Sequence, residues 1–170
     1  MYGNPEQPGL TFRTMEALFA EKAKMEKKEW KVNFKVYFLE LYCEKLVDLL
    51  SRKGDAKTEI NVKMHAGSGV TVEGVNIMDC KTKADMEKFL KSGNAQRITK
   101  ATKMNAESSR SHSIFTIIAE CDNARTGVST KGKITLCDLA GSERVAQSGV
   151  SGEELKEATA INKSRKPKIV

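Results

Sequence analysis

The segment 32–41 constrains the fold most, because it is apolar on both sides when it is drawn as a β-strand. Its apolar residues are Val32, Phe34, Val36 and Phe38 on one side, and Tyr37, Leu39 and Leu41 on the other. A strand that buries both faces normally lies in the middle of a sheet that helices cover on each side. The sequence therefore predicts an α/β fold with a central mixed sheet flanked by helices.

Composition and charge narrow the class of protein. The chain has 170 residues, of which 39% are apolar and 30% are charged, as expected for one folded domain rather than a disordered segment. No apolar run approaches the roughly 18 residues of a membrane span, so we expect no membrane partner. A net charge of +7 favours an acidic partner, either a nucleic acid or an acidic protein surface.

The cysteines and histidines do not form a metal-binding pattern. The four cysteines show no Cys-x-x-Cys spacing, and the two histidines, His65 and His112, lie far apart in the sequence, which argues against a zinc site. Cys43 and Cys137 fall in apolar, strand-like segments. We therefore expect buried, reduced thiols and a cytoplasmic protein.

Periodicity predicts the elements around the central strand. We expect one helix after the turn-rich segment 2–9, and a second that begins at a capping box formed by Thr82 and Asp85. Their apolar faces comprise Phe12, Met15, Leu18 and Phe19 in the first helix, and Met86, Phe89, Leu90 and Gly93 in the second. Alternation over residues 60–72 predicts a hairpin with a glycine-rich turn, and segments 113–120 and 131–139 predict two more strands.

Two polar motifs carry the chemistry of the chain. In the segment 134–144, an apolar run leads to Asp138, whose carboxylate can hold water on Mg²⁺, and then to Gly141, whose N–H is open to a phosphate. A simple strand followed by a turn is the alternative for this segment alone. In the segment 105–113, hydroxyl groups surround Arg110; such groups can ligate Mg²⁺, and an arginine can pair with a carboxylate or phosphate.

Together the two motifs, N-x-x-S-S-R-S-H and D-L-A-G-S-E, closely resemble the nucleotide switches of the kinesin motor domain, in the right order and at a hairpin-sized interval. The segment 38–50 also resembles the kinesin sequence E-x-Y-N-E-x-x-x-D-L-L, with Cys43 in place of the common asparagine. The resemblance makes 1–170 a partial motor domain, with switch I at about 105–113, switch II at about 138–144 and the start of a tubulin-facing helix at about 153–164.

The resemblance implies an incomplete P-loop NTPase-like motor core that takes ATP and Mg²⁺. By analogy, Ser109 would ligate Mg²⁺ directly and Asp138 would hold it through water. Ser108 and Asn105 would help to place the attacking water or phosphate, and Gly141 would sense the γ-phosphate. Arg110 and Glu143 would form a salt bridge that closes the switches. These residues are the catalytic and nucleotide-binding candidates.

The resemblance also implies a microtubule partner rather than a nucleic acid, and a place on the cytoskeleton. The candidate tubulin contacts are Lys63, His65, Arg144, Lys156, Asn162 and Lys163. A complete parent protein would be able to dimerise through a coiled-coil stalk outside these residues.

The phosphate-binding loop of this class, G-x-x-x-x-G-K-[ST], has only a near match at residues 127–133. There Ile134 follows the lysine, and the segment enters a strand instead of opening a helix. We therefore expect the chain alone to be inactive, and Met1 to be an internal methionine of a longer transcript that encodes the loop upstream. The alternatives are a nucleotide-free, degenerate motor that binds microtubules and, less well supported, a GTPase, for which Asn162-Lys163 lacks the required following Asp.

Overall fold

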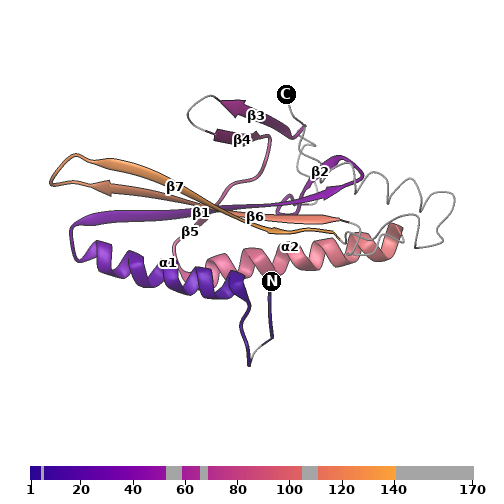
Figure 1. The fold of residues 1–170 in the computed structure, drawn as a ribbon, viewed down its shortest axis with the longest axis horizontal. Helices are drawn as coiled ribbons and strands as arrows, with labels where there is room; N and C mark the ends of the chain where they lie inside the picture. Colours follow the sequence, from indigo (N-terminus) through magenta and orange to yellow (C-terminus); the bar gives the residue numbers. More distant parts are fainter. Residues whose placement is uncertain (5, 53–58, 66–68, 105–110, 141–170) are drawn as a thin grey trace.

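The computed structural model describes residues 1–4, 6–52, 59–65, 69–104 and 111–140, and of residues 98–104 it describes the backbone only. The elements in chain order are α1 (Leu10–Glu26), β1 (Trp30–Tyr42), β2 (Lys45–Asp48), β3 (Asn61–His65), β4 (Gly69–Glu73), β5 (Met78–Cys80), α2 (Lys83–Met104), β6 (His112–Asn123) and β7 (Ser129–Asp138) (Figure 1).

β1 is the central strand of the main sheet, as its apolar pattern predicts. The sheet has the order β2-β1-β6-β7, and β5 pairs with β1 beside β2. β1 and β6 are paired over twelve positions, from Trp30 opposite Asn123 to Leu41 opposite His112. All strand pairs among the described residues are antiparallel, and β3 and β4 form a separate two-stranded hairpin.

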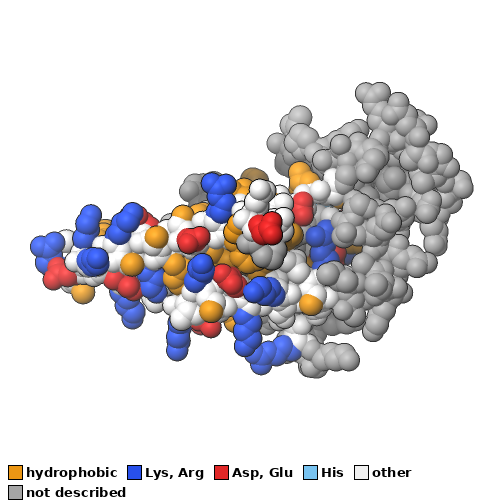
Figure 2. Space-filling view, turned by 90° about the horizontal axis from the view of Figure 1, so that it is seen from below, with side chains coloured by type: hydrophobic (Ala, Val, Ile, Leu, Met, Phe, Trp, Pro, Cys, Tyr) orange, Lys and Arg blue, Asp and Glu red, His pale blue; other side chains and the backbone are white. Residues whose placement is uncertain are grey.

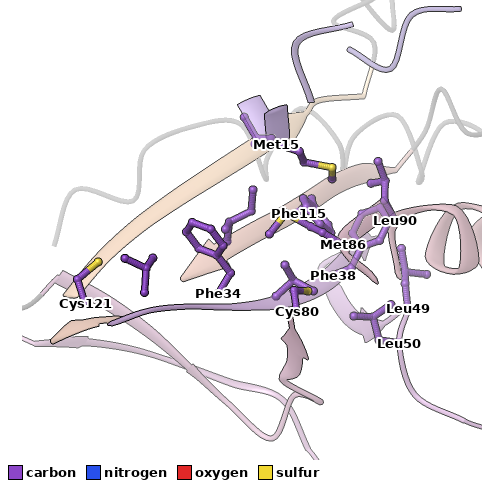
Figure 3. Close-up of a cluster of buried hydrophobic side chains, with 14 residues drawn as sticks. Met15, Phe34, Phe38, Leu49, Leu50, Cys80, Met86, Leu90, Phe115 and Cys121 are labelled. Atoms are coloured by element: carbon purple, nitrogen blue, oxygen red, sulfur yellow. The ribbon is translucent and has the colours of Figure 1, made fainter. Parts of the chain in front are cut away.

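Both described helices lie along the same face of the main sheet, below it in Figure 1. The core forms where they cover β1 and β6 (Figure 3). Phe19 of α1 packs edge-on against Phe34 with ring centroids 5.0 Å apart, and Phe38 packs in the same way against Phe115 at 5.3 Å. The predicted α/β arrangement of a sheet with helices packed on it is therefore confirmed.

The start of α2 is the predicted capping box. The N–H of Asp85 donates to Thr82 Oγ1 at 3.1 Å, and the N–H of Thr82 donates back to Asp85 Oδ2 at 2.9 Å. The hydrogen bond from the Thr82 backbone lowers the pKa of the Asp85 carboxyl. On the predicted inner face of this helix, Met86 and Leu90 are fully buried. The cap and the apolar face therefore fix where α2 begins and which side meets the sheet.

The prediction that Cys43 and Cys137 are buried is wrong. Cys43 and Glu44 form the two-residue turn between β1 and β2, with φ of 47° and 61°. Such a turn favours Asn and Gly, so the asparagine of the resembled pattern E-x-Y-N-E would suit the position of Cys43. Cys137 is exposed because its neighbour Leu136 points inward, and side chains alternate along a strand.

No helix in the described parts of the chain is both long and apolar enough to cross a membrane.

Candidate functional site

The two polar motifs predicted from the sequence meet at one end of the main sheet, the right-hand end in Figure 1. β6 begins at His112, the last residue of N-x-x-S-S-R-S-H, and β7 ends at Asp138, the first residue of D-L-A-G-S-E. Because the two strands are antiparallel neighbours, Ser113 lies opposite Asp138 in the register. The predicted hairpin between the motifs is thus confirmed, and its open end is the candidate site.

His112 connects the two motifs directly. Its Nδ1 accepts a hydrogen bond from the N–H of Ala140 at 2.9 Å, and the imidazole is buried. A ring nitrogen accepts only when it carries no proton, so the remaining ring proton of a neutral His112 is on Nε2. Any displacement of Ala140 must therefore break this bond or move the start of β6.

Ser111 is held by a buried ionic cluster that the sequence analysis did not predict. Its hydroxyl donates to Glu40 Oε1 of β1 at 2.7 Å, while Arg97 Nη2 of α2 donates to the Ser111 carbonyl oxygen at 3.0 Å. Arg97 Nε also lies 3.3 Å from Glu40 Oε1. We name Glu40, Arg97 and Ser111 the anchor cluster; each is less than a tenth exposed.

One signal for the anchor cluster is present in the sequence. Glu40 is the one acidic residue in the segment 32–41. The other residues of the second half of that segment are apolar on both sides of the strand. A carboxylate in a strand buried on both faces must have a charged or hydrogen-bonding partner. The pattern does not show which basic residue is the partner, because Arg97 is 57 positions away.

Ser113 connects the site to the N-terminal segment. Its hydroxyl shares a hydrogen bond of 3.0 Å with the hydroxyl of Tyr2. The Tyr2 carbonyl in turn accepts a bond from the N–H of Gly9 at 2.9 Å, just before α1 begins. Three consecutive residues, Ser111 to Ser113, are therefore bonded to four other parts of the chain: β1, α2, the end of β7 and the N-terminal turn.

Asp138 is the described member of the predicted Mg²⁺ site. It is half-buried at the last position of β7, where the strand fixes its backbone. A carboxylate is a hard oxygen donor, which suits Mg²⁺ held partly through water. Among the described residues no group of three or more His, Cys, Asp or Glu gathers as a metal cage. The remaining predicted site residues, Asn105, Ser108, Ser109, Arg110, Gly141 and Glu143, lie outside the described residues.

A comparison with protein families identifies this arrangement. The family model described as the kinesin motor domain matches residues 1–166. The chain belongs to the kinesin motor family. It is 40% identical over 164 residues to kinesin-like protein KIN-14I of Oryza sativa subsp. japonica and 39% identical over 168 residues to kinesin-like protein KIF13B of Homo sapiens. These matches cover 96% of this chain but only 13% and 9% of those relatives.

Solved kinesin structures share the fold. A fast kinesin matches with a TM-score of 0.81 and 33% identity, and a KIF14 motor with ADP in complex with a microtubule matches with 0.78 and 39%. The alignments cover 95% and 96% of this chain, and 45% and 48% of the solved chains. The chain therefore spans just under half of these kinesin structures, and its described part includes the strands that flank both motifs.

Two of the predicted tubulin contacts lie on the β3–β4 hairpin of this kinesin chain. Lys63 Nζ pairs with the Glu73 carboxylate at 2.7 Å, and His65 Nε2 lies 2.9 Å from Thr71 Oγ1. All four side chains lie on one exposed face of the hairpin, since they occupy facing or alternate positions in the register. The other predicted contacts, Arg144, Lys156, Asn162 and Lys163, lie outside the described residues.

The near match to a phosphate loop is part of the β6–β7 hairpin, as its sequence context predicts. Gly127 adopts φ of 70° in the turn, and Lys131 and Lys133 lie within β7. Lys131 pairs with Glu120 of β6 at 3.0 Å. The segment 127–133 therefore supplies a strand, not a phosphate cradle.

On the helix-covered face of the molecule, lysines and arginines are spread along the length, with acidic side chains among them (Figure 2).

Proposed function

We propose that this chain forms the switch region and part of the microtubule-facing surface of a kinesin motor, whose complete form couples ATP hydrolysis to movement along microtubules. The observation that carries the proposal is the hydrogen bond between His112 and the N–H of Ala140, next to the paired Ser113 and Asp138. It connects the end of the hydroxyl-rich motif to the residue just before Gly141 in the aspartate motif. A change at the phosphate-sensing motif can therefore reach the hydroxyl-rich motif through one buried contact.

The proposed roles follow the family motifs residue by residue. Asp138 and Ser109 would hold Mg²⁺, which would neutralise the phosphates of ATP when bound, while Asn105 and Ser108 would position water or phosphate. Gly141, which has no side chain, would offer its backbone N–H to the terminal phosphate. Arg110 and Glu143 would pair when the motifs close. The Coulomb attraction of such a pair is about 4 kcal/mol at an effective dielectric constant near 20, and desolvation offsets much of it.

The 170 residues contain no G-x-x-x-x-G-K-[ST], so we expect the isolated chain to bind Mg-ATP too weakly for turnover. Calorimetric titration with Mg-ATP tests this, and a micromolar Kd would contradict it.

For the microtubule, we propose contacts from Lys63, His65, Arg144, Lys156, Asn162 and Lys163. Solved relatives include a KIF14 motor in complex with a microtubule. Binding by the isolated chain should be weak and should fall with salt, because exposed charge pairs are screened over about 8 Å at physiological ionic strength. Cosedimentation that does not change between low and high salt would contradict this charge-based binding.

The decisive test of the proposed function uses a chain to which the phosphate loop has been restored. Arg110→Ala and Glu143→Ala should each abolish microtubule-stimulated ATP turnover and leave nucleotide binding intact, because each removes one partner of the proposed salt bridge. Arg125→Ala is the matched control, since Arg125 pairs with Glu29 on the exposed surface. Normal turnover in either single variant would exclude the salt bridge from the mechanism. Microtubule binding without any nucleotide dependence would favour the degenerate interaction module.

A further inference from the structure

We infer that Arg97 and Glu40 are positioning residues that set where the hydroxyl-rich motif ends and β6 begins, by holding Ser111. The functional meaning of this inference rests on the proposed function, in which that motif responds to nucleotide. The physical claim concerns the anchor cluster alone and is tested without nucleotide.

The hydrogen bonds of the anchor cluster reach the backbone of the motif and not only a side chain. Arg97 Nη2 donates to the Ser111 carbonyl oxygen at 3.0 Å and contacts the Ser111 hydroxyl at 3.1 Å. Arg97 Nε lies 3.3 Å from both the Ser111 hydroxyl and Glu40 Oε1. The planar guanidinium therefore fixes one main-chain atom, one hydroxyl and one carboxylate at the same time. A lysine, with one nitrogen at the end of a flexible chain, cannot reproduce this set.

The location of the cluster fits a positioning role. Glu40 lies opposite Ser113 in the register between β1 and β6, so it is next to the strand start that it helps to hold. Arg97 comes from α2, the helix that precedes the motif in the sequence. The motif thus follows α2 in the sequence and contains Ser111 near its C-terminal end, and Arg97 of α2 is bonded to Ser111.

Stability alone does not explain a buried ion pair at this position. Taking two charges out of water costs free energy that their attraction often fails to recover, and well-packed apolar replacements are frequently as stable. Apolar side chains already pack on this face of the sheet, because Phe38 of β1, Leu49 and Leu90 of α2 belong to the buried core that the helices cover. Apolar side chains at positions 40 and 97 would fill the space, but they would leave the Ser111 hydroxyl and carbonyl without these partners.

Hydrogen exchange on the 170-residue chain tests the inference. Arg97→Lys should speed amide exchange at His112 and Ser113 at least tenfold, relative to Thr116 and Ile117 in the middle of the same strand. The double variant Glu40→Leu/Arg97→Leu should unfold at a urea concentration close to that of the unmodified chain, yet show the same local acceleration. Arg125→Lys, which changes an exposed arginine in an ion pair with Glu29, should alter neither quantity.

Three results would overturn the inference. Two are unchanged exchange at His112 and Ser113 in the double Leu variant, and an effect of Arg97→Lys no larger than that of Arg125→Lys. If Arg97→Lys instead lowers only global stability, its exchange rates should rise equally along β6, which would also overturn it. The exchange experiment uses no nucleotide, so the inference can hold even if the chain with the restored phosphate loop shows no microtubule-stimulated turnover. Absent turnover would count against the proposed function alone.

Discussion

An ion pair between an arginine and a glutamate lies near each end of the β6–β7 hairpin, but the two pairs differ in burial. At the end with the two motifs, Arg97 and Glu40 are 3.3 Å apart, and their side chains are 10% and 11% exposed. At the turn end, Arg125 and Glu29 are closer, at 2.8 Å, but their side chains are 73% and 64% exposed. Water screens the second pair, so the longer contact has the larger consequences when it is broken.

The same contrast holds for the other polar groups. The hydroxyls of Ser111 and Ser113 and the imidazole of His112 are buried and bonded across elements. At the turn end, Ser129 bonds to Asp122 at 2.6 Å in an exposed position on the same hairpin. The turn end has one buried polar side chain, Asn123, whose amide bonds to Lys28, Arg125 and Thr126. Polar groups at the motif end are therefore mostly constrained by their surroundings, while at the turn end solvent can replace the partners of exposed groups such as Ser129 and Arg125.

The largest expected difference comes from removing one carboxylate at each end. Glu40→Leu takes away the carboxylate that faces the buried Arg97, so it should lower the free energy of unfolding by about 3–5 kcal/mol. Glu29→Leu should change it by less than about 1 kcal/mol, because its pair is exposed. Urea unfolding of both variants measures the difference, and equal losses would show that burial does not distinguish the two ends.

A second contrast concerns glycines. A Cβ added at Gly93 would lie 2.3 Å from Phe38 Cδ1, whereas a Cβ at Gly132 in β7 would meet nothing within 4 Å. Alanine gains about 1 kcal/mol of helix propensity, but overpacking a fully buried ring costs about 1–3 kcal/mol. Thermal unfolding should therefore show Gly93→Ala destabilised by up to about 2 kcal/mol and Gly132→Ala slightly stabilised. A more stable Gly93→Ala would mean that Phe38 shifts freely.

Substitutions in the turns at the two ends should change the stability of the chain in opposite directions. Glu44 adopts φ of 61° in the β1–β2 turn, and Gly127 adopts φ of 70° in the β6–β7 turn. Glu44→Gly should stabilise the chain by about 0.5 kcal/mol, because glycine relieves left-handed strain but loses more entropy on folding. Gly127→Ala should destabilise it by about 1 kcal/mol. Chemical denaturation of the two variants tests both signs, and a shift in the same direction would refute the assignment of strain.

The smallest expected effect is a pH dependence away from the motifs. Hydrogen bonds from Lys35 and then Lys131 lower the pKa of the Glu120 carboxyl. A carboxyl whose pKa is lower in the folded state than in the unfolded state stabilises the folded chain at any pH above its unfolded-state pKa. This contribution is lost as the pH falls through the folded-state pKa. The stability difference between the unmodified chain and Glu120→Gln should therefore shrink on acidification from pH 7. A difference that grows in acid would reverse the assigned sign.

The sequence was sufficient for the elements whose signals are local. The apolar faces around Met15 and Met86, the capping box at Thr82 and the alternation along β1 depend on neighbours within a few positions, so the pattern contains them. The two motifs were also brought to one end of the sheet as expected, because a hairpin necessarily pairs the start of its first strand with the end of its second.

What the sequence could not supply depends on distant partners. Glu40 and Ser111 are 71 positions apart, and nothing local indicates which hydroxyl will meet a carboxylate in the strand. The burial of Cys137 was predicted wrongly because an apolar run does not reveal which residues of an outer strand point inward. Side-chain direction in a strand is set by register against its neighbours, which only the folded chain determines.

The most direct test of the account is microtubule-stimulated ATP turnover in a chain with the phosphate loop restored, compared between Arg97→Lys and Arg125→Lys. Both variants keep the charge, and both alter an arginine paired with a glutamate. If the buried end of the sheet positions the nucleotide motifs, Arg97→Lys should lower kcat at least tenfold with little change in the KM for ATP, and Arg125→Lys should leave both unchanged. Equal turnover in the two variants would contradict the account.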